Sequence, residues 1–291
     1  MKIDVCSDLH ADAWTFYQEL DEEGNFHFVN WKKLKNPDSE VLVIAGDTSN
    51  KPETTVNIVE EACKHYDLVV IVPGNHEHYD SKLTAQELRG YFASTFSCIS
   101  PNIAFLDGDD CTFKFEDVLF VGGCGWYDWK CYMHLGIHEY IAYHAWMDMS
   151  NDARYVNVGP IHDPSWPGYH KEQPMQWLAR KQVEAFTKEV QAANANEGVR
   201  TIVMATHTSP HEKLMLWKPR DMTWNALTPS YVNTGMDAVW AGEHKISTWI
   251  YGHTHTPSQK KIDGLPINFV NNACGYPGEL GKTYKLLQLE V

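Results

Sequence analysis

The stretch VLVIAGDTSN, residues 41–50, places a polar cluster directly after an apolar run. Its first half is short, continuous and rich in β-branched residues, a composition typical of a strand buried on both faces of a parallel sheet. The runs KIDVCS (Lys2–Ser7) and LVVIVPG (Leu68–Gly74) have the same character. A helix is expected over Pro52–His65, because proline is tolerated in the first turn of a helix. This alternation of strand and helix indicates an α/β fold.

The rest of the chain continues the α/β pattern with one interruption. From residue 126 to residue 174 the periodicity is lost in a segment rich in aromatic residues, histidine and proline, which we expect to be an irregular excursion acting as a lid or binding loop. No linker or internal repeat is visible, so we expect a single domain over residues 1–291 with an aromatic-rich insertion at 126–174. The other expected elements are helices over Thr84–Phe96 and Met175–Asn196, strands within Asn102–Gly125, and strands over Val199–His207, Lys245–His253, Ile267–Gly275 and Thr283–Val291.

Composition excludes several classes of protein. Hydrophobic residues make up 43% and charged residues 21%, as in ordinary globular proteins, and the formal net charge of −14 argues against binding long duplex nucleic acid, which needs a basic face. No apolar stretch is long enough to span a membrane and no signal peptide is visible, so we expect no membrane association and a cytoplasmic location. The 7 cysteines are odd in number and lack a CxxC pair, which predicts reduced core thiols.

Five polar clusters each follow an apolar strand-like run. In open α/β sheets ligands bind beyond the carboxyl ends of the strands, so we expect these clusters to converge on one crevice. They are SDLH (7–10), GDTSN (46–50), GNHEH (74–78), THTSP (206–210) and GHTH (252–255).

The side chains in these clusters point to metal binding. Carboxylates and imidazoles crowded in a crevice would be poorly solvated without a cation, and together they suit Zn, Mn, Fe or Ni. The donors exceed the needs of one ion, whereas two ions about 3.5–4 Å apart suit phosphoryl chemistry, so one carboxylate must bridge. We expect His253 and His255 to project to the same side because they lie two apart in extended backbone. The polar side chains available in these clusters are those of Asp8, His10, Asp47, Asn75, His76, His207, His253 and His255, of which all but His76 are the expected metal ligands.

The order of these motifs resembles that of the calcineurin-like metallophosphoesterase superfamily, D-x-H, G-D, G-N-H-[DE], H and G-H-x-H, from Asp8 to His255. The resemblance implies an αββα fold, a sandwich of two β-sheets flanked by helices. It also implies an assignment of ligands: one ion held by Asp8, His10 and His255, another by Asn75, His207 and His253, with Asp47 as the bridge.

The resemblance further implies a phosphoesterase with two divalent ions, among which Mn is favoured. Such ions would lower the pKa of a bridging water and so supply a hydroxide for in-line attack on phosphorus. Asp47 and His76 are the expected catalytic residues, and Asn75 and His76 the expected contacts to the phosphate. His76 would protonate the leaving group as general acid, with Glu77 or another nearby carboxylate keeping it charged.

Departures from related motifs bear on the substrate. Protein serine/threonine phosphatases of the superfamily show GDxHG and GDxxDRG, whereas Ala11 replaces the first glycine here and GDTSNKP lacks the arginine that would grip a phosphomonoester. The favoured activity is therefore hydrolysis of a phosphodiester in a small or nucleotide-type substrate. The alternatives are hydrolysis of a nucleotide pyrophosphate bond and a phosphomonoesterase acting on a small molecule or a protein. A DNA nuclease is disfavoured by the acidic charge, and a non-catalytic metal-binding scaffold is disfavoured by the complete set of ligands.

Further residues are candidates for contact with the substrate, and the sequence does not define the oligomeric state. His78, Arg154 and His211 could touch substrate, although each is more simply a surface residue or a support for the metal ligands. Aromatic residues of the insertion could stack on a nucleobase or simply form core, and Trp14 and Phe16 are a second candidate rim. The aromatic residues of the insertion are Trp126, Tyr127, Trp129, Tyr132, Tyr143 and Trp146.

Overall fold

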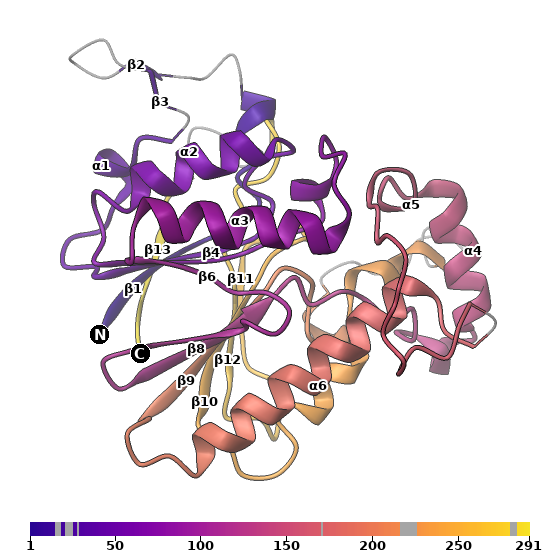
Figure 1. Ribbon diagram of the computed structural model, residues 1–291. Helices are drawn as coiled ribbons and strands as arrows, with labels where there is room; N and C mark the ends of the chain where they lie inside the picture. The colour runs from indigo at the N-terminus through magenta and orange to yellow at the C-terminus, as the bar shows by residue number, and fades with distance from the viewer. Residues whose placement is uncertain (15–18, 21–25, 28, 170, 216–225, 280–283) are drawn as a thin grey trace.

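The computed structural model describes the chain apart from residues 15–18, 21–25, 28, 170, 216–225 and 280–283. Two mixed sheets pack face to face and helices cover their outer faces, giving the expected α/β sandwich of αββα type (Figure 1). No helix in the described part of the chain is long and apolar enough to cross a membrane.

The first sheet carries the N-terminal motifs. Its four parallel strands end at the same edge, so the residues that follow them start from one place. In spatial order the sheet is β13 (Leu287–Glu290), antiparallel to its neighbour, then the parallel strands β1 (Lys2–Cys6), β4 (Val41–Ala45), β5 (Leu68–Val72) and β6 (Ile103–Phe105).

The second sheet carries the C-terminal motifs. Its four central strands are parallel and its two edge strands are antiparallel. In spatial order they are β11 (Ser258–Lys260), β12 (Asn268–Asn271), β10 (Ile246–Tyr251), β9 (Thr201–Thr206), β8 (Val118–Gly123) and β7 (Thr112–Phe115). A separate short pair, β2 (Glu19–Leu20) and β3 (Phe26–His27), lies outside both sheets.

Strand alternation sorts the apolar residues into three layers of core. Val43 of the first sheet and Val203 of the second are fully buried in the layer between the sheets. Ile44, the next residue of β4, lies in the opposite layer beneath α2 (Pro52–Ala62) and α3 (Ala85–Ile99), because successive strand residues face opposite ways. Trp249 lies in the third layer, beneath α6 (Pro174–Asn194). Burial on both faces is why these strands read as continuous apolar runs.

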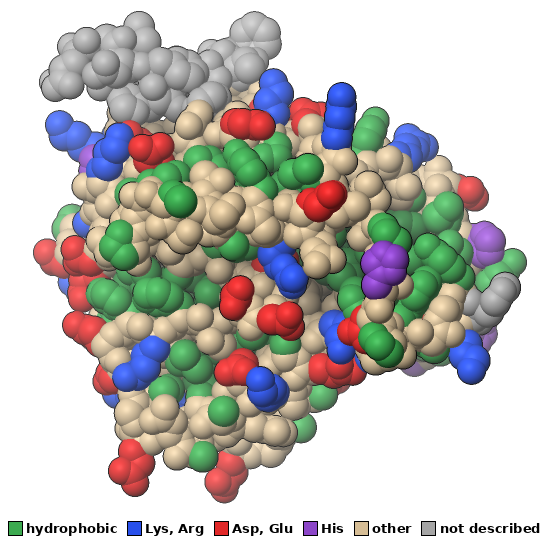
Figure 2. All heavy atoms as spheres, viewed as in Figure 1, with side chains coloured by type: hydrophobic (Ala, Val, Ile, Leu, Met, Phe, Trp, Pro, Cys, Tyr) green, Lys and Arg blue, Asp and Glu red, His purple; other side chains and the backbone are tan. Residues whose placement is uncertain are grey.

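The segment 126–174 is more regular than its sequence suggested. The expectation of an irregular excursion is wrong over α4 (Glu139–Met149), an 11-residue helix, and over the short helix α5 (Asp152–Tyr155). The helix escaped notice because its apolar residues do not fall on one face: Tyr140 and Ile141 are exposed, whereas Ala142 and Trp146 are buried. Figure 2 shows apolar side chains gathered on the surface over this part of the molecule.

The remaining elements and the cysteines need small corrections. α3 runs to Ile99 rather than Phe96, and β11 and the short helix α1 (Trp31–Leu34) were not expected. All 7 cysteines are free, but Cys98 is exposed and Cys63 is half-buried, so these two are not core thiols.

Candidate metal centre

The polar clusters converge at the carboxyl ends of five strands. Asp8 and His10 follow β1, Asp47 follows β4, and Asn75 and His76 follow β5. His207 follows β9, and His253 and His255 follow β10. These eight side chains, which come from both sheets, therefore lie together at the carboxyl ends of the strands.

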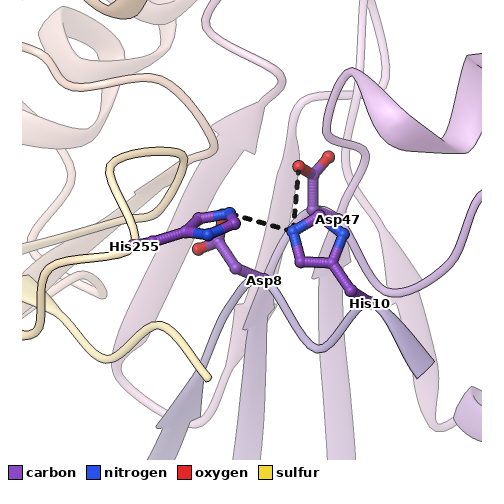
Figure 3. Close-up of side chains that lie close together, drawn as sticks. All are labelled: Asp8, His10, Asp47 and His255. Carbon is purple, nitrogen blue, oxygen red and sulfur yellow. Dashed lines mark hydrogen bonds and ion pairs between the residues drawn. The ribbon is translucent and has the colours of Figure 1, made fainter. Parts of the chain in front are cut away.

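One group of donors consists of Asp8, His10, Asp47 and His255, whose ligand atoms all lie within 4.8 Å of one another. Nε2 of His10 lies 2.9 Å from Nε2 of His255 and 3.8 Å from Oδ2 of Asp47 (Figure 3). Nε2 of His255 lies 3.4 Å from Oδ1 of Asp8. These four residues could hold a metal ion.

A second group consists of Asp47, His207 and His253 and shares its carboxylate with the first. Nε2 of His207 is its centre, 3.1 Å from Nδ1 of His253 and 3.2 Å from Oδ2 of Asp47. The amide oxygen of Asn75 lies 2.9 Å from the same nitrogen. These residues could hold another metal ion.

The chemistry of both groups fits divalent cations. In each group two imidazole nitrogens face one another at hydrogen-bond distance beside a carboxylate, and a pair of ring nitrogens can share only one proton. Nδ1 of His207 faces the carbonyl oxygen of Ala45 and Nδ1 of His255 faces the carboxylate of Glu279, both at 2.9 Å. Such partners fix the tautomer and leave Nε2 as the ligand atom.

The pKa values show the same demand for positive charge. Burial lowers the pKa of His10 and of His253 to about 4, which favours the neutral imidazole that binds a metal. Burial also opposes charge on His207 and His255, but Asp47 beside the first and Asp8 beside the second raise their pKa values to about 10 and about 9. The two carboxylates therefore favour a positive charge in both groups.

Five of the donors have left-handed backbone. The φ angle is 52° at Asp8, 42° at His10, 54° at Asp47, 66° at His253 and 47° at His255. Non-glycine residues rarely adopt this region, and those that do cluster at functional sites. The expectation that His253 and His255 lie in extended backbone is therefore wrong: both side chains reach the centre because each residue turns the chain.

Backbone amides and a buried carboxylate hold these turns in place. The amide of His253 donates to both carboxylate oxygens of Asp8, and the amide of His76 donates to Oδ1 of Asp47. Glu77 is fully buried and accepts from three amides, those of Asp47, Thr48 and Gly74. Burial and the Asp47 charge raise the pKa of Glu77, whereas these amides favour its charged form.

His76 faces the same centre with a partner that was not expected. Its Nδ1 lies 2.7 Å from the amide oxygen of Asn50, so Nδ1 carries a proton and Nε2 faces the site. Nε2 is 3.8 Å from Oδ2 of Asp47. We expected Glu77 or another nearby carboxylate to support His76; the carboxylate of Glu77 is engaged by backbone amides, and Asp47 is the carboxylate that lies beside the imidazole.

Tyr276 is part of the site and was missed in the sequence. Its ring stacks on His10 with centroids 4.3 Å apart and planes at 21°, and its hydroxyl lies 3.2 Å from Nε2 of His76. The side chain is 39% exposed, so it lies at the solvent face of the centre. The available signal was its position just beyond the strand expected over Ile267–Gly275, at the sheet edge where the other clusters lie.

The weaker candidates for substrate contact lie elsewhere. His78 is buried against Trp126 with ring centroids 5.3 Å apart, and burial lowers its pKa to about 4. Arg154 donates to the carbonyl oxygen of Asp148, and His211 accepts from the amide of Lys213. None of these contacts involves the metal-ligand groups.

The aromatic candidates are mostly core. Trp126, Tyr127 and Trp129 are at most 3% exposed and Trp146 is 7% exposed, so they offer no free ring face for a nucleobase. Tyr132 and Tyr143 are half-buried against the same cluster. Trp14 packs partly buried against the core beneath α2 and α3, and Phe16 lies outside the described residues.

Comparison with known proteins identifies the class. A model of the calcineurin-like phosphoesterase family matches residues 1–257, and the chain belongs to that family. The protein is accordingly a metal-dependent phosphoester hydrolase with Asp and His clusters that could hold its metal.

Individual relatives are distant. The chain is 20% identical over 283 residues to an uncharacterized protein of Acanthamoeba polyphaga mimivirus, covering 94% of this chain and 90% of that one. Its fold is similar to that of phosphopantetheinyl hydrolase from Mycobacterium tuberculosis, with a TM-score of 0.70, 15% identity and coverage of 99% and 95% of the two chains. A putative 5'-nucleotidase from Staphylococcus aureus matches with a TM-score of 0.45 and 14% identity over 94% of this chain and 48% of that one.

Adding one methyl group at Gly74 tests how tightly the centre is built. A Cβ there would collide with Oδ1 of Asp47 and lie 2.5 Å from its backbone nitrogen, so the loop must move. We expect Gly74→Ala to lower bound metal and to destabilise the fold by about 1–3 kcal/mol, measured by elemental analysis and thermal unfolding.

Gly90→Ala is the matched control. Gly90 lies exposed within α3 and a Cβ there meets nothing within 4 Å, so alanine should raise stability by up to about 1 kcal/mol and leave metal content unchanged. Normal metal content in Gly74→Ala would contradict the close packing of Gly74 against Asp47.

Proposed function

We propose that this protein is a dinuclear phosphodiesterase acting on a small or nucleotide-type substrate. The observation that carries the proposal is the sharing of Asp47 between the two groups of donors. Two divalent ions, when bound, would neutralise the phosphate charge and lower the pKa of a water between them toward neutrality. Asp8, His10 and His255 would hold one ion, Asn75, His207 and His253 the other, and Asp47 would bridge.

The chain's own residues supply orientation and a proton. Asn50 holds the imidazole of His76 through Nδ1, so Nε2 is the atom directed at the leaving group. When doubly protonated, His76 donates from Nε2 to the departing oxygen, while its backbone amide keeps Asp47 in place. Asn75 and His76 together would border the phosphate.

The preference for a diester rests on charge. A phosphomonoester dianion is commonly gripped by a bidentate arginine. In the described part of the chain, no lysine or arginine forms an ion pair with Asp8 or Asp47 or contacts the imidazoles around them. A phosphodiester carries only one negative charge, so it needs fewer positively charged side chains for binding than a phosphomonoester does.

The ligand types indicate the metal, and the cysteines indicate the cellular compartment. Carboxylate, amide and imidazole ligands without a thiolate suit Mn, with Fe, Zn or Ni as substitutes according to supply. The free cysteines favour a reducing compartment, so we place the protein in the cytoplasm. We propose that residues 126–174 form an insertion bordering the site within a single domain.

A substrate panel tests the function. The Mn²⁺-loaded protein should hydrolyse bis-p-nitrophenyl phosphate, cyclic nucleotides or dinucleotide polyphosphates well above p-nitrophenyl phosphate, and a phosphopantetheinyl-protein belongs in the panel. Addition of EDTA should abolish turnover. Higher activity on monoesters would replace the diester assignment, and metal binding without any hydrolysis would support a scaffold.

Removal of His76 tests the proton donor. We expect His76→Ala to keep both metal ions and to lose turnover by a factor of about 10²–10⁴ on alkyl esters, because the departing alkoxide needs a proton. The loss should be smaller with p-nitrophenyl esters, whose leaving group is a weak base. His162→Ala, a change at a histidine of the insertion outside the donor groups, is the control. Equal losses with both kinds of ester would contradict the role.

The division of ligands can be tested at two nearby histidines. His253→Ala should empty the group that contains His207, and His255→Ala should empty the group that contains Asp8 and His10. Mn²⁺ titration followed by electron paramagnetic resonance would show the loss of one ion in each variant and of the coupled signal in both. Metal counts that fell equally from both sites in both variants would contradict the division.

A further inference from the structure

Asp152 is a buried carboxylate that reaches the candidate metal centre from outside the motifs. It is 3% exposed and begins α5 in the insertion, 77 positions along the chain from Asn75. Its Oδ1 accepts from Nδ2 of Asn75 at 2.8 Å and from the hydroxyl of Tyr79 at 2.5 Å. Its Oδ2 accepts from the hydroxyl of Tyr127 at 2.8 Å.

These contacts decide which way the amide of Asn75 points. The oxygen and nitrogen of a side-chain amide have nearly the same shape, so an unrestrained amide can turn by about 180°. A carboxylate accepts hydrogen bonds and cannot donate them, so Asp152 selects the orientation with Nδ2 toward itself. Oδ1 is thereby directed to the other side, where it lies 2.9 Å from Nε2 of His207.

We propose that Asp152 is a positioning residue that holds Asn75 with its amide oxygen toward the metal centre. The inference rests on the proposed role of Asn75 as a ligand and deepens it by assigning a residue of the insertion to that half of the site. Residues that orient metal ligands commonly contribute about 10–100-fold to metal affinity.

The surroundings of Asp152 hold its side chain in position. Burial and the Asp152 carboxylate raise the pKa values of Tyr79 and Tyr127, so both phenols remain hydrogen-bond donors. Nε1 of Trp146 in α4 donates to the hydroxyl of Tyr127 at 2.5 Å, which anchors the network in the aromatic core of the insertion. A fully hydrogen-bonded network of this kind is rigid.

A purely structural role is the competing explanation, because the same bonds tie the insertion to the sheet. Asp128 provides the matched control: it is also buried in the insertion, at 7% exposure, and accepts from the hydroxyl of Thr234 and the amide of Lys130. Its carboxylate has no contact with the donor groups among the described residues.

The first experiment compares Asp152→Leu with Asp128→Leu. Mn²⁺ binding is measured by equilibrium dialysis and electron paramagnetic resonance, and folding by thermal unfolding without metal. Asp152→Leu should weaken binding of one ion by about 10–100-fold and retain the other, while Asp128→Leu should lose stability but bind both ions as the wild type does. Wild-type binding in Asp152→Leu, or equal loss in both variants, would overturn the proposal.

The second experiment exchanges the two side chains and applies even if Asp152→Leu does not fold. In Asn75→Asp two carboxylates would face one another, so Mn²⁺ affinity at about pH 8 should fall. In the double variant Asn75→Asp, Asp152→Asn, the amide introduced at position 152 can donate to the carboxylate introduced at position 75 while its oxygen accepts from Tyr127. Affinity should then return toward the wild-type value. A double variant no better than the single one would overturn the proposal.

The experiments distinguish failure of the proposed role of Asp152 from failure of the proposed phosphodiesterase function. Wild-type protein that binds two Mn²⁺ ions but hydrolyses no ester would remove the function and leave the role of Asp152 to be decided by the binding data. Wild-type protein that hydrolyses diesters, combined with unchanged metal binding in Asp152→Leu, would keep the function and remove the role.

Discussion

The carboxylate of Asp47 is the interaction on which the rest of the site depends. It is the charged group common to both sets of donors, and it lies within 3.8 Å of imidazole nitrogens of His10, His76 and His207. Burial alone would raise its pKa, but these imidazoles lower it well below the usual value. A carboxylate kept ionised while 1% exposed requires nearby positive charge, and the site can supply it by protons or by metal ions.

Holding the donors around Asp47 strains the backbone. Five donors occupy left-handed conformations, each costing on the order of 1–3 kcal/mol, so the surrounding structure must determine them fully. The three amides on Glu77 and the two contacts from the amide of His253 to Asp8 do this, with Gly74 and Gly252 leaving no room for a side chain. A centre whose backbone is fixed in this way would lose little conformational entropy on binding a metal ion.

The fold and the location of the site could be predicted because both depend on patterns within short segments of the sequence. Buried parallel strands read as apolar runs, and topology brings the residues after them to one edge, which is how Asp8, Asp47 and His207 were found. The left-handed backbone at His253 was not predictable from the sequence. The amide of His253 donates to the carboxylate of Asp8, which follows a different strand, and this contact leaves no pattern in the local sequence. Asn50 and Tyr276 were missed as partners of His76 because neither contact leaves a spacing in the chain.

Of the two roles that the aromatic composition of the insertion left open, base stacking and core packing, the structure shows core packing. Stacking on a base requires an exposed ring face, but Trp129 and Tyr127 are buried and pack with Trp146 in the core of the insertion. That core holds a carboxylate rather than a ligand: the hydroxyl of Tyr127 bonds Asp152, and Asp152 bonds the amide of Asn75. Two hydrogen bonds thus connect this aromatic-rich segment to Asn75, beside the group of donors that contains His207 and His253.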